Sequence, residues 1–305
     1  MQDPKKIIIT AAVNGPFTMR TKVAGIPFDG NPTVPYTPDE IATENEACFH
    51  QGASIAHTHT RDIETGRNVH DADLFAQSHR AIRQKTTMLC NPTTGGGGMI
   101  SHEERIGILP RLKEMGGGAA PELAELSAGS FNLDMYDPET KTYAFRDLVF
   151  NNSNAAFEMF LDVCLQCGVK PVLACFEYSH LDNVVRMFRK GLIKPPVFLD
   201  FAFCGGNVTG GLTPTLENLK GFVERVPDDM PHIWEVLSIG VNEFPMAIWA
   251  ASMGGNVRLG LEEYHYSDWG HPTTSQLIEQ FVPIAATLGR TPATTDETRE
   301  YLGLN

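Results

Sequence analysis

The sequence predicts a (β/α)8 TIM barrel, an α/β fold that a single domain forms over residues 1–305. Three observations favour it: apolar runs alternate with helix-like stretches along the whole chain, the runs number eight, and most are continuously apolar. Continuous apolar runs are typical of parallel strands that are covered on both faces. The length of 305 residues also suits this barrel.

The expected strands are short and are separated by recognisable helix starts. They cover residues 6–14, 53–60, 86–93, 123–130, 170–177, 196–204, 232–240 and 256–263. Residues 37–40 (TPDE) and 101–104 (SHEE) are capping boxes, and the first has proline at the first helical position. Thr213-Pro214 is expected to open the helix after the sixth strand, and Thr273 or Thr274 the helix after the eighth.

A doubly wound sheet is the alternative arrangement of such units. It would carry a phosphate-binding GxGxxG fingerprint after its first strand, and the stretch AAVNGPF (11–17) lacks one. We therefore favour the barrel. Its long connections, around residues 15–36 and 131–150, are expected to be active-site or subunit-contact loops.

Composition and charge narrow the classes of partner. The formal net charge of −13 argues against nucleic acid and anionic membranes. The apolar run near the N-terminus is too short for a secretory signal, and no stretch approaches the roughly 20 apolar residues of a membrane helix. We expect a cytoplasmic protein.

Six cysteines occur in apolar surroundings without the spacing of a disulfide framework. Cys164 and Cys167 form a CxxC pair in FLDVCLQCGVK, but no second CxxC exists to complete four metal ligands. We interpret both as core residues on one face of a helix.

Most of the unusual polar residues of the chain lie where the expected strands end. They are Asn14, His57, His59, Thr93, Thr94, Glu125, Ser127, Glu177, Arg258, Glu262 and Glu263. In a barrel, the C-terminal ends of several strands together build the active site. We expect the functional residues to belong to this set.

Two histidines at alternate positions, in AHTHTRD (56–62), point to a metal site. Residues i and i+2 of a strand face the same side, so His57 and His59 are expected to point the same way. The second and eighth strands are separated by one strand, which brings Glu262 within reach as a third ligand. Two imidazoles and one carboxylate suit catalytic Zn²⁺ and also non-haem Fe²⁺. The alternative is that both histidines are hydrogen-bonded core residues.

The stretch RLGLEE (258–263) supplies a candidate base. Arg258 and Glu262 share one face if the strand is regular, and Glu263 follows at its end. Glu262 then binds the metal while Glu263, near Arg258, acts as a base. A surface cluster of charges is the alternative.

The stretch TTGGGG (93–98) follows the third strand. Consecutive glycines allow backbone N–H groups to converge on a carboxylate or phosphate, and the threonine hydroxyls add donors. A flexible turn explains the glycines alone nearly as well.

Six motifs follow one another over nearly the whole chain: ITAAVNG, HTHTRD, NPTTGG, PELAELSAGSFN, GVKPVLACFE and GGNVRLGLEE. In this order they resemble the β-keto acid cleavage enzyme family, typified by the 3-keto-5-aminohexanoate cleavage enzyme. The combination of HxHxRD with R-x-G-x-E-[DE] carries most of the specificity.

The resemblance implies a zinc-containing barrel, commonly a homotetramer. Such an enzyme converts a β-keto acid and acetyl-CoA into acetoacetate and a new acyl-CoA. By similarity, His57, His59 and Glu262 correspond to the zinc ligands, with Fe²⁺, Mn²⁺ or Co²⁺ as alternative metals.

The resemblance also assigns catalytic and substrate-binding roles. Arg258 corresponds to the family arginine, and Glu263 to the aspartate that acts as the base. Thr93 corresponds to a hydroxyl residue that holds the substrate carboxylate. The expected substrate-binding residues are Thr93, Gly95, Gly96 and Glu125.

Four departures from the family pattern bear on the substrate. Glu263 replaces the usual aspartate, and Phe17 stands where the aminohexanoate enzyme has a carboxylate for the substrate ammonium. The motif K-P-E-L-E-x-F-D reads KPVLACFE (170–177), without the two inner carboxylates, and Glu125 stands where a small hydroxyl residue is usual. We therefore expect a β-keto acid other than 3-keto-5-aminohexanoate.

Two other classes of function stay open at this point. A metal-dependent hydrolase on the same barrel would carry HxH on the first strand and further histidines on the fifth and sixth, whereas here only His180 follows closely after the fifth. A non-catalytic metabolite-binding relative would tolerate the change from aspartate to Glu263 and the lost carboxylates. Incubation with acetyl-CoA and β-keto acids separates these classes.

Overall fold

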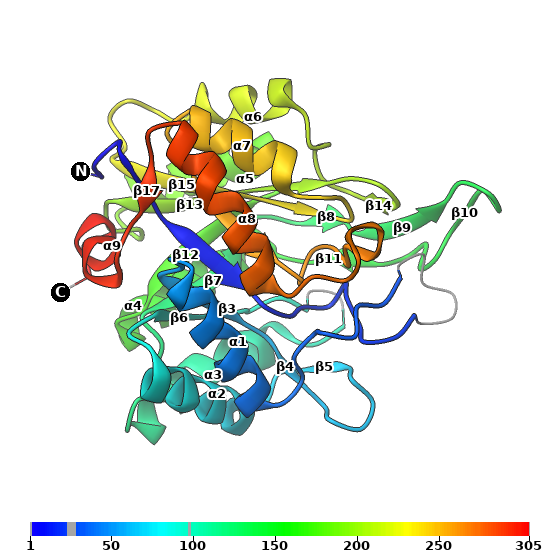
Figure 1. Cartoon of the computed structure of the whole chain (residues 1–305). Coiled ribbons are helices and arrows are strands. Elements are labelled where there is room, and N and C mark those ends of the chain that lie inside the picture. Colours follow the sequence, from blue (N-terminus) through cyan, green and yellow to red (C-terminus); the bar gives the residue numbers. More distant parts are fainter. Residues whose placement is uncertain (1, 23–28, 97–98, 305) are drawn as a thin grey trace.

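The computed structural model describes residues 2–22, 29–96 and 99–304, and a barrel of parallel strands forms its centre (Figure 1). The strands of the main sheet are β2 (Ile9–Ala12), β3 (Ile55–Thr58), β6 (Leu89–Pro92), β7 (Leu123–Ser127), β12 (Lys170–Cys175), β13 (Val197–Cys204), β15 (His232–Ile239) and β16 (Asn256–Gly260). They pair in parallel in the order β6-β3-β2-β16-β15-β13-β12-β7. A parallel bridge between Thr93, just after β6, and Glu125 on β7 joins the two ends of the sheet. The predicted barrel is confirmed.

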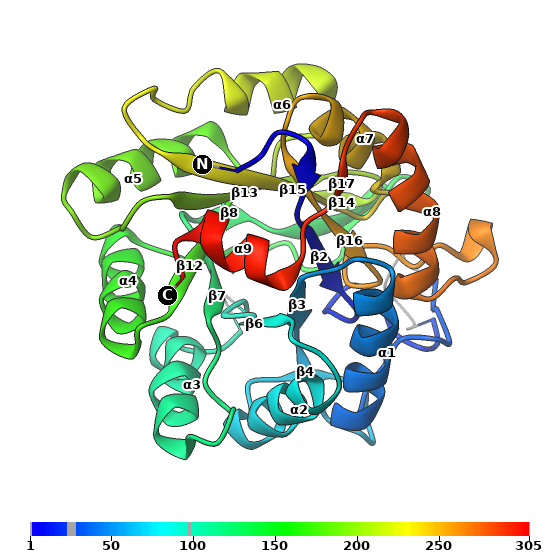
Figure 2. The ribbon, with the colours of Figure 1, turned by 60° about the vertical axis from the view of Figure 1, so that its left-hand side comes forward.

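A helix follows each barrel strand, and these helices form an outer ring around the sheet (Figure 2). They are α1 (Pro38–His50), α2 (Ala72–Lys85), α3 (His102–Met115), α4 (Asn154–Cys167), α5 (Tyr178–Arg189), α6 (Leu216–Val223), α7 (Phe244–Ser252) and α8 (Thr274–Thr287). The capping boxes at Thr37 and Ser101 are confirmed, and Thr273 is the N-cap of α8. Helix α6 starts later than predicted, at the N-cap Thr215, because Thr215 N donates to Thr213 O and closes a turn before the helix.

Short strands lie in the connections outside the main sheet. They are β1 (Lys6–Ile7), β4 (Thr60–Arg61), β5 (Asn68–Val69), β8 (Phe131–Asn132), β9 (Asp134–Asp137), β10 (Thr142–Tyr143), β11 (Val149–Phe150), β14 (Val208–Thr209) and β17 (Thr291–Pro292). The predicted first strand, 6–14, is divided, because Ile8 N donates to Asn256 Oδ1 (2.7 Å) and β1 pairs with β17 instead. The connection 131–150 contains antiparallel pairs and projects from the barrel as the β9–β10 hairpin (Figure 1).

The N-terminal end of the barrel interior is filled by hydrocarbon. Its side chains, which we call the apolar floor, are Ile8, Ile55, Leu89, Leu123, Val172, Phe198 and Ile233. Helix α9 (Thr295–Leu302) lies across this end, and its Leu302 packs into the same cluster (Figure 2). A short 3₁₀ helix, Ser267–Trp269, lies between β16 and α8. Because hydrocarbon side chains fill this end, a polar site inside the barrel is expected at its other end.

The cysteines are free thiols, as expected from their spacing. Cys164 lies in the core and Cys167 is half-buried against it, both on α4, so the CxxC pair belongs to helix packing. Among the described residues, no helix combines the length and the apolar character needed to cross a membrane.

Candidate active site

Four ionisable side chains from alternate barrel strands meet above the apolar floor. They are His57 on β3, Glu125 on β7, Asp200 on β13 and Arg258 on β16. Arg258 Nη1 contacts Glu125 Oε2 and lies 3.5 Å from Asp200 Oδ2. His57 Nδ1 lies 3.4 Å from the same Glu125 oxygen. Because alternate strands of a barrel contribute layers of four side chains, we call this set the ionisable layer.

The structure brings the three predicted metal ligands together. Candidate ligand atoms of His57, His59 and Glu262 all lie within 4.8 Å of one another, and the three residues are buried. His59 Nε2 lies 2.8 Å from Glu262 Oε1, and His57 Nε2 lies 3.1 Å from Glu262 Oε2. His59 comes just after the end of β3, yet its side chain keeps the alternation of the strand. Both Nε2 atoms therefore face one carboxylate.

This donor set fits a divalent transition metal. The His57 side chain is fully buried, yet neither of its nitrogens has a hydrogen-bond partner among the described residues. A buried polar nitrogen normally has a partner. Burial lowers the pKa of His59, which favours the neutral ring that metal binding needs. Burial alone would raise the pKa of Glu262, but Arg258 and the histidines outweigh it and hold that pKa well below its usual range. Two neutral imidazoles and one carboxylate suit Zn²⁺ or Fe²⁺.

Arg258 joins a candidate metal ligand to the candidate base. Its Nη2 lies 2.7 Å from Glu262 Oε2 and 2.7 Å from Glu263 Oε1. Burial raises the pKa of Glu263 well above its usual value, and Arg258 opposes this rise. Burial would lower the pKa of Arg258, but the surrounding carboxylates outweigh it, so the guanidinium stays charged. A carboxyl with a raised pKa beside a fixed cation is a typical environment for a general base.

The candidate ligand Glu262 and the candidate base Glu263 lie in a turn rather than in a regular strand. Strand β16 ends at Gly260, so the predicted strand 256–263 is too long. A Cβ on Gly260 would lie 2.0 Å from Ala12 O, and one on Gly15 would lie 1.9 Å from Glu262 Cγ. The chain after β2 therefore packs directly against Glu262 and turns it toward the barrel interior.

The glycine-rich loop begins at Thr93, directly after β6 ends at Pro92. Thr93 Oγ1 accepts a hydrogen bond from Gly95 N (2.9 Å), and His70 Nε2 donates to Gly95 O (2.6 Å). Gly96 has a φ of 101°, which favours glycine. Residues 97–98 lie outside the described residues. An anion at this loop would be bound by donors other than the Gly95 N–H, and the anion site stays a prediction.

The opposite side of the barrel mouth is apolar. The members of this cluster, which we call the apolar wall, are Phe131, Met135, Phe150, Ala174, Phe176, Ala202, Cys204, Val208, Leu237 and Ile239. The rings of Phe131 and Phe176 stack with their centroids 4.2 Å apart. Phe17 packs against the wall, and it lies two residues beyond Gly15, which covers Glu262. Phe17 therefore links the wall to the segment that packs against Glu262.

Three buried carboxyl groups around Arg258 were not predicted from the sequence. Asp200 contacts Arg258 directly, and Glu235 accepts a hydrogen bond from Thr10 Oγ1 (2.6 Å). Burial raises the pKa of Glu235 to about 7 and that of Glu243 to about 8. A single acidic residue inside an apolar strand, as in VFLDFAFC and HIWEVLSIG, is the signal that marks two of them.

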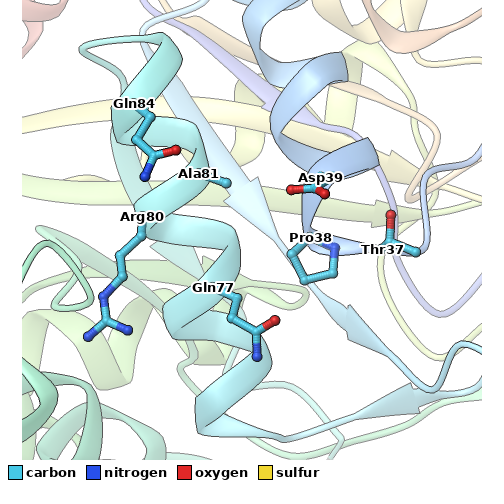
Figure 3. Close-up of a pocket in the computed structure, with 7 residues that line it drawn as sticks. All are labelled: Thr37, Pro38, Asp39, Gln77, Arg80, Ala81 and Gln84. Atoms are coloured by element: carbon cyan, nitrogen blue, oxygen red, sulfur yellow. The ribbon is translucent and has the colours of Figure 1, made fainter.

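A separate hollow lies on the outer surface, between α1 and α2 (Figure 3). Its lining residues are Thr37, Pro38, Asp39, Gln77, Arg80, Ala81 and Gln84. All of them belong to the helical ring or its caps, and none is a candidate site residue. The hollow is therefore no part of the site described above.

Relatives identify the class of enzyme. A profile of the beta-keto acid cleavage enzyme family matches residues 6–304. The 3-keto-5-aminohexanoate cleavage enzyme of Fusobacterium nucleatum is 32% identical over 304 residues, which are 98% of this chain and 98% of the relative. The 3,5-dioxohexanoate:acetyl-CoA acetone transferase of Paraburkholderia graminis is 29% identical over 321 residues, 100% of this chain and 97% of that enzyme.

Solved structures show the same fold. The complex of ObcA with oxaloacetate superposes with a TM-score of 0.72 at 18% identity, over 89% of this chain and 67% of ObcA. Apo ObcA gives a TM-score of 0.71, with 66% of its length covered. This likeness supports the barrel, while the whole-chain matches carry the assignment. The chain belongs to the β-keto acid cleavage enzyme family.

Proposed function

We propose that the protein is a zinc-dependent enzyme that converts a β-keto acid and acetyl-CoA into acetoacetate and a new acyl-CoA. Family membership supports the reaction class, and relatives are named as acetyl-CoA transferases or cleavage enzymes. The observation that carries the proposal is the grouping of His57, His59 and Glu262 next to the Arg258–Glu263 pair.

In this proposal the two histidines and Glu262 hold the metal. A bound Zn²⁺ supplies Lewis acidity that polarises the keto oxygen and acidifies C2 of the substrate. The Thr93 hydroxyl and the backbone N–H of Gly96 bind the substrate carboxylate at the end of β6, while Gly95 N donates to Thr93 Oγ1 and holds that side chain in place.

Glu263 moves the proton. It removes a proton from C2, and Arg258, 2.7 Å away, holds the carboxylate in place. Glu263 keeps that proton while C2 attacks the acetyl carbonyl carbon and the C–S bond of the thioester breaks. The released CoA thiolate then adds to the keto carbon of the substrate. Glu263 returns the proton to C2 when the bond between C2 and that carbon breaks, so the cycle has no net proton loss.

We also propose that the substrate carries an uncharged, apolar side chain rather than the ammonium group of 3-keto-5-aminohexanoate. Phe17 packs against the apolar wall, and it lies two residues beyond Gly15, which packs against the candidate ligand Glu262. A substrate ammonium there would lose its hydration without gaining a carboxylate partner from the wall, which is costly. An alkyl or aromatic substituent would instead gain by leaving water.

A steady-state assay over a panel of β-keto acids tests both parts. Acetoacetate and a new acyl-CoA should form only when acetyl-CoA is present, with the highest kcat/KM for substrates with alkyl or aromatic side chains. Product release without acetyl-CoA would indicate a hydrolase, and binding without turnover would indicate a non-catalytic relative. Best turnover with the amino substrate would refute the apolar preference alone.

The role of Glu263 has its own test. Glu263→Gln should lower kcat by about 10²–10⁴-fold, the usual contribution of a general base, while bound Zn²⁺ stays stoichiometric. Glu279→Gln, at an exposed position of α8, is the matched control and should behave as wild type. A fully active Glu263→Gln enzyme would contradict the assignment of Glu263 as the base.

A homotetramer and a cytoplasmic location remain predictions. Light scattering tests the first and cell fractionation tests the second.

A further inference from the structure

Glu125 is a half-buried acidic residue that the proposed chemistry does not use. It lies on β7, and 14% of its side chain is exposed. Its backbone is fixed at the seam of the barrel, because it forms the bridge to Thr93 and its carbonyl accepts the Thr94 hydroxyl. A side chain on so rigid a segment is well suited to position others.

One oxygen of Glu125 lies between two functional groups. Oε2 contacts Arg258 Nη1 and lies 3.4 Å from His57 Nδ1. The other nitrogen of the same ring, His57 Nε2, lies 3.1 Å from Glu262 Oε2. The imidazole is thus placed with one nitrogen toward a carboxylate of the ionisable layer and the other toward the candidate metal site.

The tautomer of a metal-binding histidine is normally set by the partner of its second nitrogen. His57 Nδ1 is buried and has no hydrogen-bond partner among the described residues. Glu125 Oε2, 3.4 Å away, is therefore the oxygen positioned to accept a hydrogen bond from a protonated Nδ1. A proton on Nδ1 leaves the lone pair of Nε2 free for a metal. The same oxygen fixes the guanidinium whose other nitrogen contacts Glu262 and Glu263.

We propose that Glu125 is a positioning residue whose single Oε2 atom links the metal ligand His57 to Arg258. It holds His57 as the tautomer that presents Nε2, and it holds Arg258 toward Glu262 and Glu263. This inference rests on the proposed metal site, and it gives Glu125 a role other than the direct substrate contact expected from the sequence.

Asp200 provides the matched control. Its Oδ2 lies 3.5 Å from Arg258 Nη1, which Glu125 contacts more closely, but among the described residues no ion pair joins Asp200 to His57. Replacing either carboxyl group by its amide removes one acidic partner of Arg258. Only the change at Glu125 also removes the anionic acceptor facing His57 Nδ1.

The experiment measures Zn²⁺ affinity by competition with a chelator, without substrate, for wild type, Glu125→Gln and Asp200→Asn. Glu125→Gln should lose about 10–100-fold in affinity, the usual effect of removing the partner of a metal-binding histidine. Asp200→Asn should keep the wild-type affinity, and both variants should lower kcat through Arg258. Equal Zn²⁺ affinities for the two variants would overturn the proposal.

A second measurement needs no variant. In zinc-loaded wild type, ¹⁵N-edited histidine spectra should show the His57 proton on Nδ1. A proton on Nε2, with zinc bound through Nδ1, would overturn the proposal even if Glu125→Gln failed to fold. Both readouts are independent of turnover, so their failure is distinguishable from failure of the proposed reaction.

Discussion

Two successive layers of one barrel differ in what their burial costs. The apolar floor buries hydrocarbon side chains such as Phe198, and this burial stabilises the fold. Two residues beyond the floor on β3, β7 and β13 lie His57, Glu125 and Asp200, which form the ionisable layer together with Arg258 on β16. His57, Asp200 and Arg258 are buried and Glu125 is half-buried, and their desolvation opposes folding unless every charge is paired. Burial of the ionisable layer therefore does not by itself stabilise the fold, which depends on hydrocarbon burial in layers such as the floor.

Removing a ligand above the ionisable layer should have the largest effect. His59→Ala leaves one imidazole and one carboxylate, so we expect stoichiometric Zn²⁺ binding to be lost. A Lewis acid contributes several kcal/mol to such a reaction, so kcat/KM should fall by about 10³-fold or more. Zn²⁺ should also raise the melting temperature of wild type but not of the variant, since only a bound metal stabilises the native state.

The control for His59→Ala is metal-free wild type, which should melt at about the same temperature as the variant because neither gains from metal binding. Elemental analysis of the purified variant supplies the decisive number. Retention of one zinc per chain would contradict the assignment of His59 as a ligand.

A change in the apolar floor should separate stability from chemistry. Phe198→Ala deletes a buried ring, and the cavity should lower the free energy of unfolding by about 3–5 kcal/mol. Zn²⁺ affinity of the folded protein should stay at the wild-type value, since Phe198 belongs to the hydrocarbon cluster of the floor and is not a candidate ligand. Urea denaturation and chelator competition measure the two quantities. Loss of metal binding with little loss of stability would contradict this separation, because it would show that the apolar floor also determines metal affinity.

A pH-dependent effect is expected beneath Arg258 in the metal-free protein. Burial raises the pKa of Glu235 from 4.5 to about 7, so the folded state keeps a proton that the unfolded state releases. The free energy of unfolding should therefore fall as the pH rises from about 4.5 to 7. Glu235→Gln has no such proton, and above pH 7 it should be more stable than wild type by up to about 3 kcal/mol.

Denaturation of the metal-free proteins at pH 5 and pH 8 measures this difference. Glu279→Gln, on the exposed face of α8, is the control, and its stability should follow that of wild type at both pH values. A Glu235→Gln protein that tracks wild type at both pH values would show that burial of this carboxyl carries no penalty.

The barrel and the ligand set were predictable because both depend on local periodicity. Alternation at i and i+2 fixes the direction of His57 and His59. The order of the strands then places Glu262 near them, because only β2 lies between β3 and β16. The catalytic role of these residues stays a proposal, but their proximity followed from the sequence. The end of β16 at Gly260 did not, because it depends on the close approach of Ala12.

The rest of the site depends on contacts between distant segments. Strand parity indicates that Asp200 and Glu235 are interior positions, but not that they lie near Arg258. Likewise, Phe131 and Phe150 come from a connection that reads as a loop, and they join the apolar wall only through pairing of β8 with β11. The identity of a substrate-facing surface is therefore a tertiary property.

The smallest predicted effect comes from removing one methyl group from the apolar floor. Ile233→Val removes a single buried carbon from the apolar floor, and the free energy of unfolding should fall by about 0.5–1.5 kcal/mol. Glu235 lies two residues further along β15. If the substitution changed the surroundings of this carboxyl, the pH dependence of the free energy of unfolding would change as well. We expect no such change, because the valine keeps the β-branched shape that packs in the floor. Denaturation at pH 5 and pH 8 should give the same loss for this variant, and a loss that differs between the two pH values would show that the floor and the ionisable layer are coupled.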